Sequence, residues 1–151
     1  MEAQVLKDRV AIVTGSSRGL GEGIAKAMAK EGAIVALFSR DYDRTKEHEK
    51  EIKTLGQRAI ACKVDVTDFK QVTSAVQDLL KQFQRVDILV NNAAIAPNMP
   101  FLDITDEMRN DVINVNFNGV WNCTKAVLPS MIKNKYGKII NISSVTGPFV
   151  T

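Results

Sequence analysis

A glycine-rich turn near the N-terminus has the residue types needed to hold a phosphate group. Residues 14–21 read TGSSRGLG and lie between an apolar run and a segment of helical periodicity. Gly15 permits a tight turn, Gly19 lets backbone approach a pyrophosphate, and Gly21 lets the helix pack closely. Unpaired N–H groups at the helix N-terminus favour anionic oxygens. The predicted phosphate-binding residues are Gly15, Ser17, Arg18, Gly19, Leu20 and Gly21. A plain glycine turn is the alternative, because the spacing differs from the commonest dinucleotide fingerprint.

The end of the next apolar run indicates which dinucleotide the turn would hold. Ser39 and Arg40 stand there, where folds selective for NAD carry an acidic side chain that binds the ribose 2′-hydroxyl. The guanidinium groups of Arg40 and Arg18 can instead bind a 2′-phosphate, because their planar donors match phosphate oxygens. The pattern therefore favours NADP(H). The alternative is that each Arg is a solvated charge and that Asp41 accepts a hydrogen bond from the ribose.

Two further pairs of residues are candidate cofactor ligands. Asp65 could accept a hydrogen bond from an adenine amino group while Val66 covers the ring. A loop Asp or a helix cap before Thr67 explains the carboxylate equally well. Asn92 and Ala93 combine an amide with a small side chain and suit a close backbone approach to a ligand, although Asn residues are also common in turns.

Asn116 and Ser144 are the candidates for the chemical step. Asn116 interrupts the apolar face of a long helical segment, and a buried Asn must be hydrogen-bonded. A local hydrogen bond within the helix is the simpler interpretation. Ser143 and Ser144 follow the last apolar run, where a hydroxyl could reach a substrate, and an ordinary turn is again the alternative.

Short apolar runs predict the strands that position these residues. The runs cover residues 9–13, 34–38, 59–64, 86–90 and 138–142. Each is almost continuously apolar, as expected of strands covered on both faces, and helical stretches separate them, as in βαβ units. The sequence therefore predicts one α/β domain over residues 1–151 with a doubly wound parallel sheet. Ligands of such sheets bind at the carboxyl ends of the strands.

The predicted helices differ in character. Helical periodicity covers residues 20–28, 42–55, 69–83 and 105–133. Asp68 and Gln71 predict a capping box at the start of the third helix. The second helix is charge-rich, so we expect it and His48 to be solvated. The fourth is expected to be one long buried helix, with Phe117 and Trp121 in the core or in a subunit interface.

The composition and charge exclude several classes of protein. The chain is 45% hydrophobic and 25% charged with a net charge of +3, and the two signs are interleaved, so a nucleic-acid-binding face is not expected. The longest apolar run, 34–38, is far shorter than the roughly 20 residues of a membrane-spanning helix. Residues 1–10 lack the apolar core of a secretory signal, so we expect a cytoplasmic protein. Cys62 and Cys123 lack metal-ligand spacing and are expected to be buried free thiols without a metal.

Taken together, these motifs resemble those of the short-chain dehydrogenase/reductase family, including the bacterial 3-oxoacyl-carrier-protein reductases. Residues 14–21 match its Thr-Gly-x-x-x-Gly-x-Gly turn, and 91–94 match its Asn-Asn-Ala-Gly motif with Ala94 in place of the last Gly. Asp65 falls at the family's adenine-contacting acid, and Asn116 and Ser144 at its catalytic Asn and Ser. The resemblance implies a Rossmann-like sheet of strand order 3-2-1-4-5 and NADP(H)-dependent interconversion of a ketone and a secondary alcohol. It also implies a small-molecule carbonyl or alcohol substrate and a homo-oligomer.

The resemblance also implies that part of the active site is missing. Ser144 would bind the substrate carbonyl and Asn116 would hold a water in a proton relay, but the family's Tyr proton donor and its Lys would lie beyond Thr151. The only tyrosines, Tyr42 and Tyr136, precede that position. We therefore expect a fragment that lacks the C-terminal strands and is inactive alone. The alternative is a non-catalytic dinucleotide-binding module, which would leave 138–142 as an exposed apolar edge strand.

Overall fold

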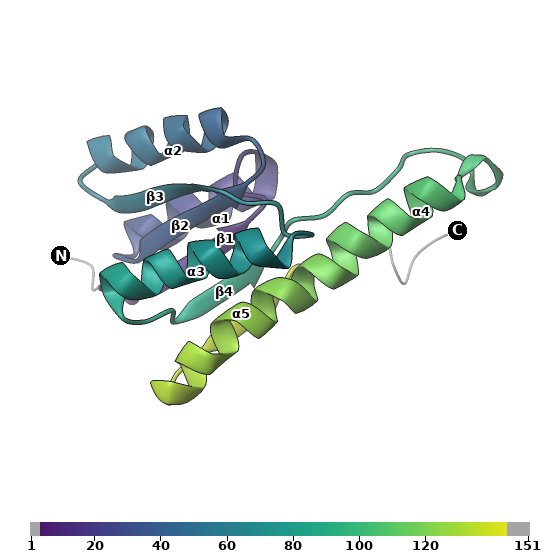
Figure 1. Ribbon diagram of the computed structural model, residues 1–151. Coiled ribbons are helices and arrows are strands. Elements are labelled where there is room, and N and C mark those ends of the chain that lie inside the picture. Colours follow the sequence, from purple (N-terminus) through teal and green to yellow (C-terminus); the bar gives the residue numbers. More distant parts are fainter. Residues whose placement is uncertain (1–3, 145–151) are drawn as a thin grey trace.

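A single parallel sheet forms the centre of the computed structural model, which describes residues 4–144 (Figure 1). Its five strands lie in the order β3-β2-β1-β4-β5. They are β1 (Val10–Thr14), β2 (Ile34–Ser39), β3 (Arg58–Lys63), β4 (Ile88–Asn91) and β5 (Lys138–Asn141). The predicted α/β fold and the strand order implied by the family resemblance are confirmed.

Helices cover both faces of the sheet, as the doubly wound arrangement requires. The helices that flank it are α1 (Gly19–Lys30), α2 (Tyr42–Thr54), α3 (Phe69–Phe83) and α5 (Gly119–Lys133). In β1, Val10 and Ile12 pack in the core formed with α3 and α5, whereas Ala11 and Val13 pack in the core formed with α1 and α2. This alternation follows from the two-residue period of a strand. The central strands are buried on both faces for this reason.

The two edge strands are less buried than predicted. The ends of β3 are exposed and its middle is partly buried, and all four residues of β5 are exposed. Ile140 of β5, for example, is 46% exposed. An edge strand has a neighbour on one side only, and no described strand pairs with the outer edge of β5. The expectation that every apolar run is covered on both faces is therefore wrong for β3 and β5.

The predicted long helix is continuous but is buried only in part. A short 3₁₀ turn, η1 (Phe101–Asp103), precedes α4 (Asp106–Ile113), a π-helical turn η2 (Asn114–Asn118), and α5. Figure 1 shows α4 projecting beyond the sheet, and none of its residues is buried. Phe117 and Trp121 are 68% and 63% exposed. Placing them in the core is therefore wrong, and the interface interpretation stays a prediction.

Helix α2 is amphipathic, although its composition predicts a solvated helix. It buries Thr45, His48, Glu49 and Ile52 at three- and four-residue steps, and His48 is only 7% exposed. Burial alone would raise the pKa of Glu49, but hydrogen bonds from lysines on α2 hold it below its ordinary value. The high charge of α2 hid this buried face, and the expectation of a solvated His48 is wrong.

Other expectations about the chain are met in part. Asp68 caps α3 by accepting from the backbone N–H groups of Lys70 and Gln71, whereas the Gln71 side chain accepts from Asp65 N–H instead of closing the predicted capping box. Cys123 is buried as predicted and Cys62 is partly buried, and both thiols are free. None of the helices that the structure describes is long and apolar enough to cross a bilayer.

Candidate functional site

A cleft of about 230 Å³ lies at the carboxyl ends of the strands. Nearly all of the predicted cofactor ligands line it, namely Gly15, Ser17, Arg18, Ser39, Arg40, Asp65, Val66, Asn92 and Ala93. The others, Gly19, Leu20 and Gly21, form the first turn of α1 beside it. Residues that are far apart in the sequence thus border one cavity, at the edge of the sheet where α/β proteins bind ligands.

Hydrogen bonds join the glycine-rich turn after β1 to the loop after β4. The hydroxyl Oγ1 of Thr14, only 1% exposed, accepts from the backbone N–H groups of Asn92 and Ala93, both at 2.9 Å. The Asn92 amide Nδ2 donates in return to the carbonyl oxygens of Thr14 and Gly15, at 3.0 and 3.3 Å. The turn and the loop therefore form one unit, in which Thr14 and Asn92 fix the backbone of the cleft.

The glycines of the turn are required for close packing and for backbone geometry. A Cβ on Gly15 would lie 2.9 Å from Ala93 Cα, and a Cβ on Gly21 would collide with Asn92 Nδ2 and the Gly15 carbonyl oxygen. Gly19 has a φ of +61°, and no described atom lies within 4 Å of the position its Cβ would take. The turn is thus packed tightly on the protein side and open at Gly19, where a ligand could approach the backbone.

Two cationic side chains border the cleft near the end of β2. Arg40 and Arg18 are both exposed and line it. Ser39 is 8% exposed, and its Oγ accepts from the backbone N–H of Asp41. The Asp41 carboxylate caps α2 by accepting from the Arg44 N–H at 3.2 Å. Asp41 is not among the residues that line the cleft, whereas the two guanidinium groups line it and are suited to a phosphate.

The residues after β3 are oriented by neighbours on both sides. Asp65 Oδ1 accepts from the backbone N–H and the hydroxyl of Thr67, at 2.9 and 2.8 Å. A carboxylate has further accepting capacity, so this turn and a ligand contact are compatible. The carbonyl of Val66 accepts from Asn122 Nδ2 of α5 at 2.9 Å. A Cβ on Gly119 would come 2.7 Å from Val66 Cγ2, so Gly119 and Asn122 together hold Val66 in the wall of the cleft.

The Asn116 side chain holds the loop after β4. Its Oδ1 accepts from the Ile95 N–H and its Nδ2 donates to the Ile95 carbonyl, both at 2.9 Å. The expectation of a buried Asn with a local helix hydrogen bond is wrong, because Asn116 is exposed and its partner lies on another segment. Asn116 stands inside the π-helical turn η2, a feature that is frequent at functional sites.

Ser144 lies in the loop that leaves β5 on the same edge of the sheet. The backbone N–H of Ile142 donates to the Asn91 carbonyl at 2.9 Å, so this loop begins beside the end of β4. Ser144 is exposed and is the last residue that the structure describes.

A model of the family described as short chain dehydrogenase matches residues 9–150. The chain belongs to the short-chain dehydrogenase family. Among curated relatives, it is 45% identical over 145 residues to the oxidoreductase UcpA of Salmonella typhimurium, covering 96% of this chain and 55% of the relative. It is 36% identical over 141 residues to the 3-oxoacyl-[acyl-carrier-protein] reductase FabG of Staphylococcus epidermidis, covering 93% and 58%.

Solved structures of short-chain dehydrogenases have the same fold. A metagenomic short-chain oxidoreductase in complex with NADP superposes with a TM-score of 0.85 at 35% identity, covering 93% of this chain and 64% of that one. A putative short-chain alcohol dehydrogenase from Sinorhizobium meliloti superposes with a TM-score of 0.88 at 33% identity, covering 95% and 57%. This short-chain dehydrogenase chain spans about half the length of the curated relatives it matches.

Some residues that shape the cleft of this short-chain dehydrogenase were not found from the sequence. Asn122 and His48 hold backbone carbonyls of the cleft through hydrogen bonds to Val66 and Ser17. Each residue is far from its partner in the sequence, so no local sequence pattern predicts these hydrogen bonds. A signal was present for Gly119, since a glycine inside an apolar helix indicates a close approach.

Proposed function

We propose that the protein is an NADP(H)-dependent oxidoreductase that interconverts a ketone and a secondary alcohol by hydride transfer. The observation that carries the proposal is the cleft in which the glycine-rich turn meets Arg18 and Arg40. That the chain is related to oxidoreductases follows from its membership of the family. The NADP complex of the metagenomic relative and the reductase name of the staphylococcal relative support the cofactor and the reaction class.

The residues of the cleft fit NADP(H). Gly15, Gly19 and the first turn of α1 suit a pyrophosphate, because their backbone is accessible and a Cβ would fill or strain the turn. Arg18 and Arg40 suit the 2′-phosphate. Asp65 and Val66 suit the amino group and the face of the adenine. When bound, the cofactor supplies or accepts the hydride.

The chain's own polar groups would serve the carbonyl. We assign to Ser144 a hydrogen bond that its hydroxyl donates to the substrate oxygen, which stabilises the charge that develops there during reduction. We assign to Asn116 the orientation of a water in a proton relay, and its clamp on Ile95 fixes the backbone for that role. The proton donor implied by the family resemblance, a Tyr assisted by a Lys, would lie beyond Thr151.

We propose that the whole protein acts on a small-molecule carbonyl or alcohol and assembles as a homo-oligomer. The exposed Phe117 of η2 and Trp121 of α5 support assembly, because large apolar side chains that gather on one surface favour protein contacts.

Two measurements on the full-length protein test the proposal. Titration with NADPH and NADH should show tighter binding of NADPH, and a panel of ketones should support NADPH oxidation followed at its absorbance band. Failure to bind either nucleotide would contradict the cofactor assignment. Binding without turnover of any ketone or secondary alcohol would favour the alternative, a non-catalytic dinucleotide-binding module.

A further inference from the structure

A buried histidine lies directly behind the glycine-rich turn. His48 of α2 has a side chain that is 9% exposed, and its Nε2 lies 3.0 Å from the carbonyl oxygen of Ser17. A carbonyl oxygen can only accept a hydrogen bond, so Nε2 must carry the hydrogen and donate it. A side chain of α2 therefore holds part of the glycine-rich turn, although His48 does not itself line the cleft.

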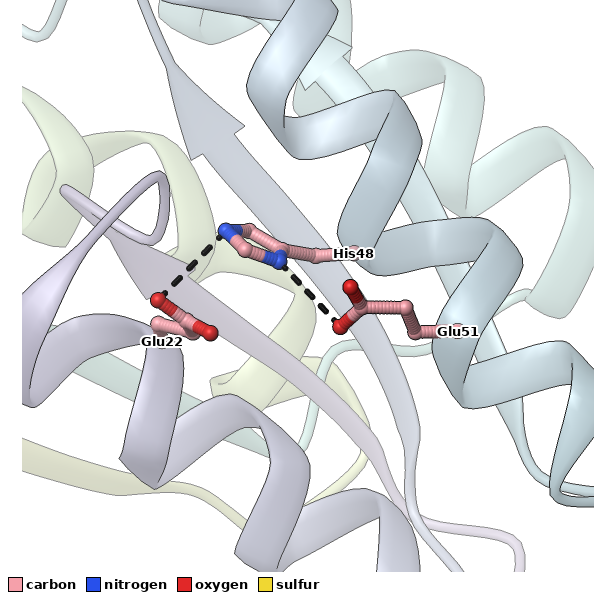
Figure 2. Close-up of side chains that lie close together, drawn as sticks. All are labelled: Glu22, His48 and Glu51. Carbon is pink, nitrogen blue, oxygen red and sulfur yellow. Dashed lines mark ion pairs between the residues drawn. The ribbon is translucent and has the colours of Figure 1, made fainter.

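Carboxylates on two helices flank the imidazole ring (Figure 2). Glu22 of α1 places its Oε2 3.5 Å from His48 Nε2, and Glu51 of α2 places its Oε2 3.6 Å from Nδ1. Lys26 Nζ lies 2.7 Å from both carboxylates. Its hydrogen bonds hold the pKa of Glu22 and of Glu51 below their ordinary values, so both stay ionised at neutral pH.

Glu22, His48 and Glu51 are also residue types that bind metal ions, and their ligand atoms lie within 4.8 Å of one another. Lys26, however, already makes the contacts with Glu22 and Glu51 that a bound cation would need. The cluster is therefore an ion-pair network centred on Lys26, and the hydrogen bond that orients the ring beside it is the one from Nε2 to the Ser17 carbonyl.

The geometry of the peptide bond passes this orientation on to the cleft. No peptide bond among the described residues is cis, and in a trans peptide the C=O and the following N–H point in opposite directions. Because the Ser17 carbonyl points at His48, the Arg18 N–H points away from it. Both Ser17 and Arg18 line the cleft.

We propose that His48 is a positioning residue for the cofactor: it fixes the Ser17–Arg18 peptide so that the Arg18 backbone N–H is presented to a phosphate of the dinucleotide. The inference rests on the proposed function, because the hydrogen bond from His48 to Ser17 can position a cofactor only if the turn binds a phosphate. An N–H held in place before binding loses less conformational freedom when the ligand arrives.

The test replaces His48 by residues that differ in their ability to donate to Ser17. His48→Leu keeps an apolar side chain in the buried site and removes the donor, whereas the amide of His48→Gln can place an N–H near the position of Nε2. We expect the Kd of the full-length protein for NADPH to rise on the order of 10-fold in His48→Leu, since a carbonyl that loses its donor is no longer held. His48→Gln should recover most of this loss.

A control on the same helix separates positioning from stability. Ile52 is 1% exposed, one turn further along α2, and packs in the core formed with α1 without lining the cleft. Ile52→Val should lower the melting temperature and leave the Kd unchanged. If His48→Leu does not fold, His48→Asn takes its place, because the shorter amide cannot reach Ser17 and the comparison with His48→Gln is kept.

The outcomes distinguish this inference from the proposed function. A lack of NADPH binding by the unaltered protein would overturn the proposed function and the inference with it. Normal NADPH binding by the unaltered protein, together with an unchanged Kd in His48→Leu, would overturn the inference alone. A Kd that rises equally in the Leu, Asn and Gln variants would also overturn it, because the donor would then not be the property that matters.

Discussion

Arg40 is the side chain on which the choice of cofactor depends in our proposal. It is exposed, borders the cleft and stands where a carboxylate would select NAD. We expect Arg40→Ala to raise the Kd for NADPH by about 10- to 100-fold, because a hydrogen bond to a charged group contributes roughly 1.5–3 kcal/mol. The Kd for NADH should be nearly unchanged, as both titrations of the full-length protein would record.

Arg44 offers a control for the loss of positive charge. It lies in the first turn of α2, is exposed, and is not among the residues that line the cleft. Arg44→Ala should leave both Kd values unchanged. Equal losses for NADPH and NADH in Arg40→Ala would contradict the assignment of Arg40 to the 2′-phosphate.

Gly21 and Gly23 differ in what a methyl group would meet. A Cβ on Gly21 would collide with Asn92 and the Gly15 carbonyl, whereas a Cβ on Gly23 would meet no described atom within 4 Å. Gly21→Ala should therefore destabilise the fold by about 1–3 kcal/mol, as overpacking does, and weaken NADPH binding by displacing the turn. Thermal unfolding and nucleotide titration would record the two effects.

Gly23→Ala is the matched control for that prediction. Both glycines lie in α1, and Ala is the better helix former by about 1 kcal/mol. We expect Gly23→Ala to raise the melting temperature and to leave NADPH binding unchanged. The assignment of Gly21 to close packing would be refuted by a Gly21→Ala protein as stable as Gly23→Ala.

The two thiols should be unreactive in the folded protein. Burial raises the pKa of Cys62 and of Cys123 from an ordinary value of 9.0 to about 12. A thiolate is the reactive form, so iodoacetamide at pH 8 should label these thiols far more slowly than a free cysteine. Because the pKa is raised on folding, the stability that these groups contribute is present below pH 9 and is lost as the pH rises toward 12. Rapid labelling at pH 8, measured by mass spectrometry, would show that the thiols are accessible.

At the scale of the elements, the hydrophobic pattern correctly predicts the burial of strands that helices cover on both faces. It does not predict the exposure of an edge strand. Strands β1, β2 and β4 appear within two residues of their predicted positions because burial on both faces makes them continuously apolar. The apolar composition of β5 by itself predicts cover on both faces, although all four of its residues are exposed. Burial depends on neighbours that a local pattern does not contain.

Helix α2 shows the opposite error. Its charged composition predicted full solvation, yet Glu49 is buried with ion pairs to Lys46 and Lys53, and His48 is buried with a hydrogen bond to the Ser17 carbonyl. The residues of the candidate site likewise comprise some that the sequence predicts and some that it does not. The turn, the arginines and Asn92 could be predicted because each lies directly after a strand, whereas Asn122 acts through a partner on another segment.

The surface of η2 and α5 carries a prediction about assembly. Trp121 is 63% exposed beside Phe117, which is 68% exposed. If this surface joins copies of the chain, Trp121→Glu should lower the molar mass of the full-length protein in light scattering, because it places a charge in an apolar contact. Leu55→Glu, a change at a 73% exposed residue at the end of α2, is the control and should leave the mass unchanged. A molar mass that Trp121→Glu does not alter would argue against this interface.

At the scale of the whole molecule, cofactor binding and proton transfer are expected to depend on different parts of the polypeptide. Every predicted cofactor ligand lies between Gly15 and Ala93, in the stretch of chain that runs from the end of β1 to the loop after β4. The Tyr and Lys implied by the family resemblance would lie beyond Thr151. The two functions should therefore be separable by truncation.

A polypeptide of residues 1–151 alone, with its ends verified by intact mass, tests whether cofactor binding and proton transfer can be separated. We expect it to reduce ketones at least about 100-fold more slowly than the full-length protein, because a positioned general acid typically contributes 10²- to 10⁴-fold. Its Ser144 could still bind a carbonyl, but nothing in our assignment would deliver the proton. Wherever this polypeptide is soluble and folded, NADPH should still bind, since Arg18, Arg40 and the glycine turn are all present. Ketone reduction at the full-length rate would mean that a group within residues 1–151 supplies the proton, and the assignment of that role to a later Tyr would be wrong.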